Sequence, residues 1–316
     1  MSVLATPRRD ERAGKAPGPR RRRSWRVGHH DTMWAALFLL PAIVAIVTLR
    51  VLPALEAVRD SLYRGFPGGL RPERFTGLDN YTNLFADPGF RATLVRTIVF
   101  NAIINPLQIV LALLLAVLLT QTLHLRGVWR TLIFIPCTIP IVGSSIAWGA
   151  ALRPDGPVNA LLAAVGLSPQ PFLTSPNQAL ACIILIASWI GIGYWMLFLI
   201  AGLQAVPHEL YEAARLDRAG PIRTFLSVTL PMLRRPLLFV LVADTVANFV
   251  LFVPVQLLTN GGPESSTTIL MFDAYRTTFG FSSRNLGAAE VVVLSAVMLA
   301  IVAVQFRLLR DDGGDS

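Results

Sequence analysis

Six long apolar stretches alternate with polar segments along this chain of 316 residues. Each has at least about 20 residues, the length at which a helix crosses a bilayer with every backbone polar group paired inside the segment. None contains a lysine, and their charged residues lie near the ends, apart from Asp244. The pattern predicts an all-α, polytopic membrane protein with six transmembrane helices at residues 33–52, 94–119, 131–152, 179–203, 236–258 and 288–308.

Proline occurs inside several of these stretches, as Pro41, Pro106, Pro136, Pro140 and Pro254. A proline within a helix removes one backbone hydrogen bond and kinks the helix. Kinked helices suit a cavity, but proline is also common in membrane helices generally. The kinks could therefore serve the function of the protein or be a common feature of membrane helices, and both interpretations are open.

The overall composition agrees with a membrane protein, because 53 % of the residues are hydrophobic and only 15 % are charged. The net charge of +9 would suit nucleic acid, but the basic residues are concentrated at the N-terminus and in short loops. We expect membrane lipid as a partner and no nucleic acid.

Residues 1–31 hold nine of the 28 basic residues and few large apolar side chains, which predicts a disordered basic tail. A cleaved signal is the weaker alternative, because the apolar stretch that follows is long for a signal and lacks a clear cleavage site. Lys and Arg are enriched in cytoplasmic loops, and their distribution predicts that both termini are cytoplasmic. Residues 311–316 form a short acidic tail.

The fifth stretch carries a polar stripe, with Asp244, Asn248, Phe252 and Gln256 at steps of four residues on one side of a helix. Facing lipid would be costly for these polar groups, so the stripe is a candidate substrate path. A polar clamp between helices is an equally good interpretation.

Amides and aromatic residues in the second and fourth stretches are of the types that bind sugars, since amides bond hydroxyl pairs and aromatic faces cover the C–H side of a ring. The same aromatic residues are also typical of the membrane interface. Trp189 is the aromatic candidate for the substrate path. The full set is Asn101, Asn105, Gln108, Trp189, Tyr194 and Trp195.

A short helix is predicted within the loop at residues 204–235. Pro207 precedes it, Glu209 and Glu212 fall in its first turns, and Gly220-Pro221 ends it. Leu210, Ala213, Ala214 and Asp217 share one face, which allows insertion into a partner's groove.

This loop resembles the EAA loop of ABC importer permeases, which docks on the ATPase subunit, through Glu212-Ala213-Ala214 and Leu230-Pro231. Other segments resemble the carbohydrate-uptake branch of that family, which includes maltose and glycerol-phosphate permeases, and the resemblance covers residues 32–309. These segments are Gly77-Leu-Asp-Asn-Tyr81, Leu125-Arg-Gly127, Ala201-Gly-Leu-Gln204 with Pro207, and Leu258-Thr-Asn-Gly-Gly-Pro263.

The resemblance implies a type I ABC importer permease fold over residues 32–310 and import of a sugar, an oligosaccharide or a glycerol-phosphate-like solute. It also implies a second permease subunit as heterodimer partner, a homodimeric cytoplasmic ATPase and an extracytoplasmic solute-binding protein. The ATPase-coupling residues that it implies are Glu212, Ala213, Ala214, Leu216, Asp217, Arg218 and Gly220. The only lysine, Lys15, has no phosphate-binding loop around it, so this chain itself is not expected to hydrolyse ATP.

The loop departs from the family at one position, because Arg218 stands where the run Asp-Gly-Ala usually has glycine. Two interpretations are open: a turn that needs glycine has shifted to Gly220, or the helix continues to Ala219.

Two other function classes are weaker. An ion-coupled secondary transporter would predict an internal repeat and several intramembrane carboxylates, and an integral membrane enzyme would need an acid–base pair or a metal cluster. The apolar surroundings of Cys137 and Cys182 disfavour a disulfide, and no cofactor or metal is expected.

Overall fold

The computed structural model describes residues 29–65, 73–121 and 124–309. The predicted tails at residues 1–31 and 311–316 lie outside these ranges, apart from the last three residues of the first. The chain forms two compact units, residues 1–53 and 54–316.

The first unit is helical throughout its described part. It comprises α1 (His29–Ile46), the π-helical turn η1 (Val47–Val51) and the beginning of α2 (Leu52–Ser61). The apolar run continues over Leu37–Ser61 and is long enough to cross a membrane. Pro41 lies inside α1 without ending it. The first predicted transmembrane helix is therefore confirmed as a helix, and it extends beyond residue 52.

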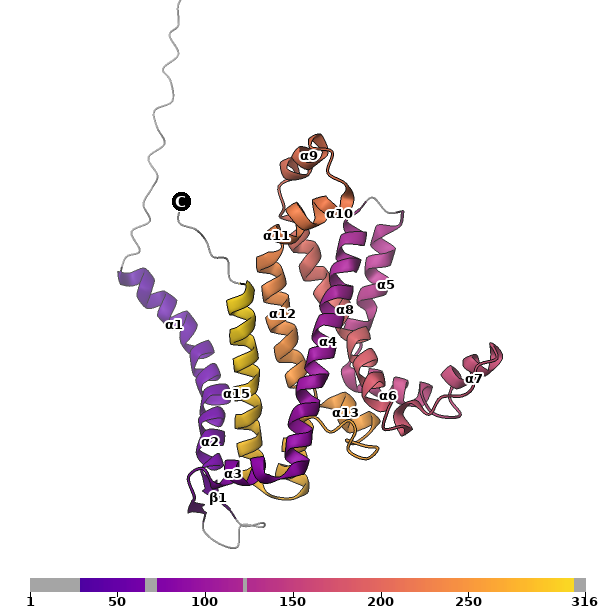
Figure 1. Cartoon of the computed structure of the whole chain (residues 1–316). Coiled ribbons are helices and arrows are strands. Elements are labelled where there is room, and N and C mark those ends of the chain that lie inside the picture. The colour runs from indigo at the N-terminus through magenta and orange to yellow at the C-terminus, as the bar shows by residue number, and fades with distance from the viewer. Residues whose placement is uncertain (1–28, 66–72, 122–123, 310–316) are drawn as a thin grey trace, which may run out of the picture. The chain divides into compact units, whose positions relative to one another are not determined.

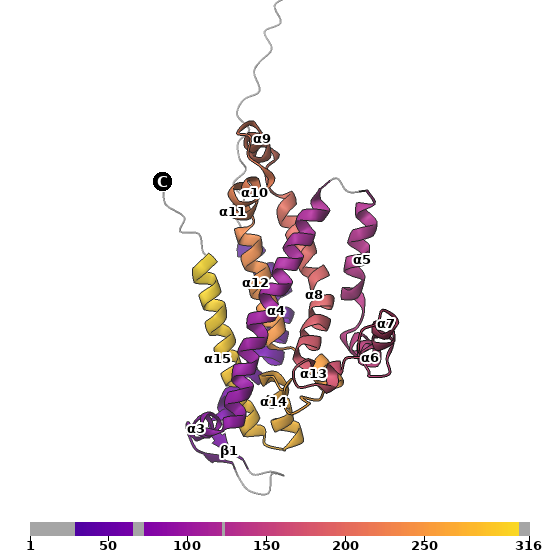
Figure 2. The ribbon, with the colours of Figure 1, turned by 45° about the vertical axis from the view of Figure 1, so that its right-hand side comes forward.

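The second unit is a bundle in which the long helices α4, α8, α12 and α15 run side by side (Figures 1 and 2). Its elements are β1 (Tyr63–Arg64), β2 (Arg74–Phe75), α3 (Asp79–Ala86), α4 (Pro88–Thr120), α5 (Arg126–Thr138), α6 (Ile141–Ala151), α7 (Pro157–Ala164), η3 (Phe172–Thr174), α8 (Ala179–Gln204), α9 (His208–Leu216), α10 (Pro221–Thr224), η4 (Phe225–Thr229), α11 (Leu230–Met232), α12 (Arg234–Phe249), α13 (Val253–Leu258), α14 (Leu270–Tyr275), η5 (Arg276–Gly280) and α15 (Arg284–Leu309).

The bundle packs through apolar clusters between its long helices. Ala112 and Ala116 of α4 are buried against Met196 and Leu199 of α8, and small side chains on one helix let the other approach closely. The N-terminus of α4 is capped by Asp87, whose Oδ1 accepts a hydrogen bond from the Gly89 amide at 2.9 Å. Asp87 thereby fixes the point at which α4 begins.

The third predicted span is not one straight helix. It divides into α5 and α6, which are bent by 96°. Ile139 is extended because the residue before a proline avoids the helical region, and Pro140 is the N-cap of α6. In both views α5 begins at the end of the bundle that carries α9, and α6 lies toward the opposite end, beside α13 (Figures 1 and 2). The prediction of a continuous helix over residues 131–152 is wrong at this bend.

The fifth predicted span is also interrupted. Helix α12 ends at Phe249, Phe252 leaves the helical conformation with a φ of −132°, and α13 begins at Val253. Pro254 contributes by lacking an amide hydrogen that a continuous helix would use. The predicted stripe from Asp244 to Gln256 therefore crosses a break.

A small antiparallel hairpin at the start of the second unit departs from the all-helical expectation. It pairs Tyr63 with Phe75 and is followed by α3. Asn80 donates from Nδ2 to the carbonyl oxygens of Ser61 and Tyr63 at 2.7 and 2.8 Å. The motif at residues 77–81 thus ties α3 to the end of α2 and to β1.

Candidate functional site

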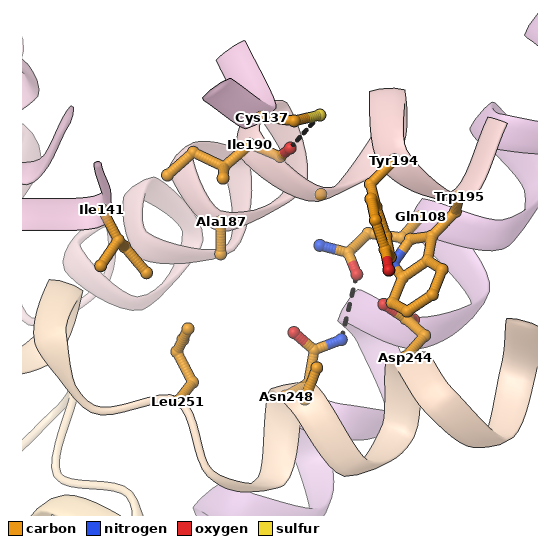
Figure 3. A pocket seen from close by; sticks show the side chains of 12 residues that line it. Gln108, Cys137, Ile141, Ala187, Ile190, Tyr194, Trp195, Asp244, Asn248 and Leu251 are labelled. Carbon is orange, nitrogen blue, oxygen red and sulfur yellow. Dashed lines mark hydrogen bonds between the residues drawn. The ribbon is translucent and has the colours of Figure 1, made fainter. Parts of the chain in front are cut away.

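A cavity of about 290 Å³ lies among α4, α5, α8 and α12 and the start of α6 (Figure 3). One side is polar and another is aromatic. Its lining includes Gln108, Cys137, Gly191, Tyr194, Trp195, Asp244 and Asn248.

The amide groups beside this cavity form a network that joins three helices. Asn248 donates from Nδ2 to Asn105 Oδ1 at 2.8 Å and to Gln108 Oε1 at 3.0 Å. Asn105 and Gln305 both donate to Thr245 Oγ1, at 3.1 and 2.8 Å. The polar positions of the second and fifth predicted spans therefore meet, and they clamp α4, α12 and α15 while facing a cavity.

The Asp244 carboxylate is the most polar group of the cavity wall. The residue is only 1 % exposed, and the Trp195 indole and the Asn248 amide interact with its carboxylate. Its Oδ2 has no hydrogen-bond partner among residues 29–65, 73–121 and 124–309. A buried acceptor of this kind is available to a hydroxyl or amine of a ligand.

The aromatic wall comes from α8, where Tyr194 and Trp195 stand edge to face with ring centroids 4.9 Å apart. Two glycines of this helix allow its neighbours to approach. A β-carbon at Gly191 would lie 3.1 Å from Gln108 Nε2, and one at Gly193 would overlap the carbonyl oxygen of Ile133. Glycine is required at residue 193, where α8 meets the backbone of α5, whereas at residue 191 a β-carbon would only press on the end of the Gln108 side chain.

Of the five predicted path residues, the structure places Asp244 and Asn248 at this cavity, and Phe252, Gln256 and Trp189 are not part of its lining. Phe252 packs on Tyr275 with ring centroids 4.6 Å apart, and Gln256 belongs to α13. Trp189 stands edge to face with Trp148 at 5.5 Å and lines a separate apolar cavity of about 280 Å³.

Sequence reasoning missed Cys137 and Gly191 at this site. The Cys137 thiol donates to the Ile190 carbonyl oxygen at 3.0 Å across the contact of α5 and α8. A single cysteine or glycine in an apolar run has no spacing signal, so only the packing of the two helices identifies them.

The predicted loop helix is present as α9, at the end of the bundle where α4 stops (Figure 1). Ala214 is buried and Ala213 is exposed, so the face predicted to carry both alanines does not present them together. Glu212 is exposed, and Leu216 is 85 % exposed although it is a large apolar side chain. Glu212 and Leu216 therefore lie on the outer side of α9, where a partner has access to them.

The inner side of α9 is held against the rest of the loop. The Tyr211 hydroxyl and the Thr229 hydroxyl are hydrogen bonded at 3.2 Å. Tyr211 and Arg215 also line a cavity of about 700 Å³ between α9, η4 and the ends of α4 and α8. The tyrosine links α9 to the segment that leads into α12.

Helix α9 ends in a turn centred on Arg218. The Arg218 amide donates to the Arg215 carbonyl at 3.0 Å, and the Ala219 amide donates to the Ala214 carbonyl at 2.9 Å. This pair of bonds is the Schellman motif, whose left-handed residue is usually glycine. Here Arg218 takes that conformation with a φ of 53°, and Gly220 has an ordinary φ of −67°. Both predicted alternatives are wrong: the turn stays at residue 218, and the helix ends before Ala219.

Comparison with known families gives one match that covers residues 108–311. The matching family is described as the binding-protein-dependent transport system inner membrane component. The matched region contains the cavity residues from Gln108 onward and the whole of the α9 loop.

Relatives along most of the chain are permeases of transport systems. The lactose transport system permease protein LacF of Rhizobium radiobacter is 35 % identical over 87 % of this chain and 93 % of its own length. The sulfoquinovosyl glycerol permease SmoG of Agrobacterium fabrum is 33 % identical over 89 % and 91 %. The sn-glycerol-3-phosphate permease UgpA of Yersinia enterocolitica is 31 % identical over 87 % and 93 %.

Solved structures share the fold. A chain of a bacterial ABC transporter involved in the import of the polysaccharide alginate aligns over 90 % of this chain and 97 % of its own, with a TM-score of 0.76 and 21 % identity. The same kind of transporter in complex with an alginate pentasaccharide-bound periplasmic protein gives a TM-score of 0.73 at 22 % identity, over 89 % and 95 % of the two chains.

Proposed function

We propose that the solute of this chain is a carbohydrate or a closely related polyol. The chain belongs to the family of binding-protein-dependent transport system inner membrane components and is a multi-pass permease subunit of an ABC importer. This membership favours the importer over an ion-coupled secondary transporter. It also means that the chain is a transport subunit and not itself an enzyme.

The observation that carries the carbohydrate proposal is the cavity between α4, α8 and α12. Asp244 offers acceptors, Gln108 offers an amide with both donor and acceptor, and Tyr194 and Trp195 offer aromatic faces. A sugar combines hydroxyls that donate and accept with apolar C–H faces, so it matches this mixture. The names of the relatives, which transport lactose, sulfoquinovosyl glycerol and glycerol 3-phosphate, support the same class.

We assign the α9 loop to the docking of a homodimeric cytoplasmic ATPase. A large apolar side chain such as Leu216, exposed at the end of a short helix, is the kind of group that a protein partner buries. A second permease subunit completes the heterodimer in this proposal, and an extracytoplasmic binding protein delivers the solute. The complex of a structural relative with a periplasmic protein supports the last partner.

The same assignment sets the orientation. The loop after α8 carries Arg215, Arg218, Arg223, Arg234 and Arg235, and such enrichment is typical of the cytoplasmic side. In this orientation the α9 end of the second unit and both chain termini are cytoplasmic.

Coupling then runs through the contacts of α9. ATP-driven closure of the partner moves α9, and the Tyr211–Thr229 hydrogen bond passes the movement to the segment that begins α12. Helix α12 carries Asp244 and Asn248, and the amide network joins it to α4 and α15. A displacement of α12 therefore changes the cavity and opens it alternately to the two sides.

The test is uptake by the complete importer in proteoliposomes, with lactose, maltose, glycerol and glycerol 3-phosphate as probes. We expect ATP-dependent uptake of at least one probe, and Glu212→Lys should abolish both uptake and substrate-stimulated ATP hydrolysis. Asp155→Lys is the matched control, because Asp155 is also an exposed acid but lies in the loop after α6, away from α9.

Two results would count against the proposal. Uptake of none of these probes would remove the carbohydrate assignment. Full activity of Glu212→Lys would remove the coupling role of α9, and uptake by this chain without an ATPase would favour the secondary transporter.

A further inference from the structure

A second cavity, of about 490 Å³, lies at the end of the bundle opposite α9. It is enclosed by the start of α4, the segment from Glu264 to Ser283 that contains α14 and η5, and the start of α15. Its volume falls within the range of roughly 300–1,000 Å³ that is typical of small-molecule sites.

Glu290 on α15 forms the deepest charged part of this cavity. The residue is 3 % exposed, and its Oε1 accepts a hydrogen bond from Thr277 Oγ1 at 2.9 Å. Its Oε2 is buried and has no hydrogen-bond partner within the described part of the chain. One strong acceptor is therefore left for something inside the cavity.

Arg276 supplies the matching donor on the same cavity wall. Its Nη2 pairs with Asp273 Oδ1 at 2.7 Å, and its guanidinium lies 5.6 Å from the centre of the Phe281 ring. Its Nε is buried and, like the Glu290 oxygen, has no partner among the residues that the structure describes. The salt bridge with Asp273 holds the guanidinium in place without using this donor.

An unused donor and an unused acceptor in one cavity restrict the chemistry of the ligand. A bare cation would satisfy Glu290 but leave the Arg276 Nε donor without an acceptor, and an anion would do the reverse. No group of three His, Cys, Asp or Glu side chains in the described ranges is arranged to hold a metal ion. A hydroxyl both donates and accepts, so a molecule with several hydroxyls satisfies both groups at once.

We propose that this cavity is an outer binding subsite for a neutral polyhydroxylated solute, held between Glu290, Arg276 and the ring of Phe281. The inference rests on the proposed function, which makes this end of the bundle extracytoplasmic. A solute released from the binding protein would meet this subsite before the cavity at Asp244. Arg96, which lines the same cavity, donates to the Thr268 carbonyl at 3.0 Å and stabilises the loop that closes it.

Protection of an introduced cysteine tests the proposal in the complete importer. Ser283 lines the cavity and is partly exposed, so Ser283→Cys, in a background with Cys137→Ala and Cys182→Ala, reports access by N-ethylmaleimide. We expect lactose, maltose or glycerol to slow alkylation severalfold, and sodium or calcium chloride to leave the rate unchanged. Asp155→Cys, on a remote exposed loop, should not be protected.

Variants of the acid connect protection to the proposed contacts. Glu290→Leu should abolish protection, Glu290→Gln should retain part of it, and Asp155→Asn, outside the cavity, should retain all of it. If Glu290→Leu fails to assemble, Thr277→Val serves instead, because it removes the hydroxyl that holds Glu290 and should weaken protection.

The inference is overturned if no probe protects, if protection survives Glu290→Leu, or if the salts protect and the probes do not. Uptake by the unmodified importer keeps this outcome separate from that of the proposed function. Carbohydrate uptake without protection removes only the outer subsite, whereas protection without uptake of any probe removes the proposed function and leaves a binding site.

Discussion

Arg218 illustrates how one backbone angle decides where helix α9 ends. Its φ of 53° brings the β-carbon close to the following carbonyl, which costs about 1–2 kcal/mol for residues other than glycine. The two Schellman hydrogen bonds at Arg218 and Ala219 keep the turn in this conformation. The turn is therefore required by the loop, and arginine fills it at a cost in stability.

Replacing the side chain separates this backbone effect from the loss of a charge. We predict that the free energy of unfolding is about 1 kcal/mol higher for Arg218→Gly than for Arg218→Ala, so the glycine variant is more stable. Alanine keeps the β-carbon that is strained in the left-handed conformation, and glycine removes it. Denaturant titration of the purified complex measures the difference. Equal stability of the two variants would show that the left-handed angle is relaxed in solution, and Gly220→Ala should not reproduce the effect because its φ is ordinary.

The cavity residues show how far sequence reasoning reaches at this scale. Asp244 and Asn248 are conspicuous because polar groups are rare in membrane helices. Their partners are not predictable in the same way, since Asn248 bonds to Gln108, which is 140 residues away in the chain. Cys137 gives no signal at all, because its position at the cavity depends on the packing of α5 on α8.

At the scale of elements, the contact of α5 and α8 depends on a single missing side chain. A β-carbon at Gly193 would overlap the Ile133 carbonyl oxygen and lie 2.9 Å from Cys137 Sγ. We predict that Gly193→Ala lowers the free energy of unfolding by about 1–3 kcal/mol, the usual cost of overpacking, and alters the cavity that Cys137 lines.

Gly143 on α6 provides the control for this prediction. A β-carbon there would meet nothing within 4 Å, so Gly143→Ala should instead stabilise its helix by up to about 1 kcal/mol. Denaturant titration of both variants should thus give changes of opposite sign. Destabilisation of similar size in both would mean that glycine itself matters in these helices and not the close contact.

Hydropathy predicts where the helices lie, but it does not predict where they break. Pro106 and Pro136 remain inside α4 and α5, whereas Pro140 is the N-cap of the helix that follows the 96° bend. Pro254 stands just after the break that ends α12. A proline lowers the energetic cost of a break because it has no amide hydrogen for the helix to bond. The contacts of the neighbouring helices then decide whether a break forms.

At the scale of the whole molecule, the bent pair of α5 and α6 determines the topology. If this pair crosses the membrane, the chain has six spans, and the α9 loop lies on the same side as both termini. If the pair is a re-entrant loop, five spans remain, and the α9 loop and the C-terminus lie opposite the N-terminus. We expect the first arrangement, because α5 begins at the α9 end of the second unit and α6 lies toward the opposite end, beside α13 (Figure 2).

Cysteine labelling of intact cells with an impermeant maleimide distinguishes these topologies. Asp155→Cys in the loop after α6 should be labelled from outside, and Arg218→Cys after α9 should be labelled only when the membrane is permeabilised. A cysteine added before residue 29 should behave like Arg218→Cys. Opposite behaviour of this N-terminal cysteine and Arg218→Cys would contradict six spans.

In the assembled importer, we expect the exposed Leu216 side chain of α9 to be buried by the ATPase. Leu216 is 85 % exposed on this helix, and burying a leucine in a partner is worth about 1.5–3 kcal/mol. Because 1.4 kcal/mol corresponds to a tenfold change in affinity, Leu216→Asp should weaken ATPase binding by about tenfold or more. Leu161→Asp is the matched control, since Leu161 is 70 % exposed on α7, at the other end of the bundle.

Docking and coupling are separable through the inner side of the same helix. Tyr211→Phe removes the hydroxyl that bonds to Thr229 and keeps the ring, so the ATPase should still bind with its normal affinity. Stimulation of ATP hydrolysis by solute should fall, because movement of α9 is then less firmly transmitted to α12. Affinity measured on nanodisc-embedded complexes, together with basal and stimulated ATPase rates, tests both variants. If Tyr211→Phe loses ATPase binding and Leu216→Asp loses only stimulation, the inner and outer sides of α9 have the reverse of these roles.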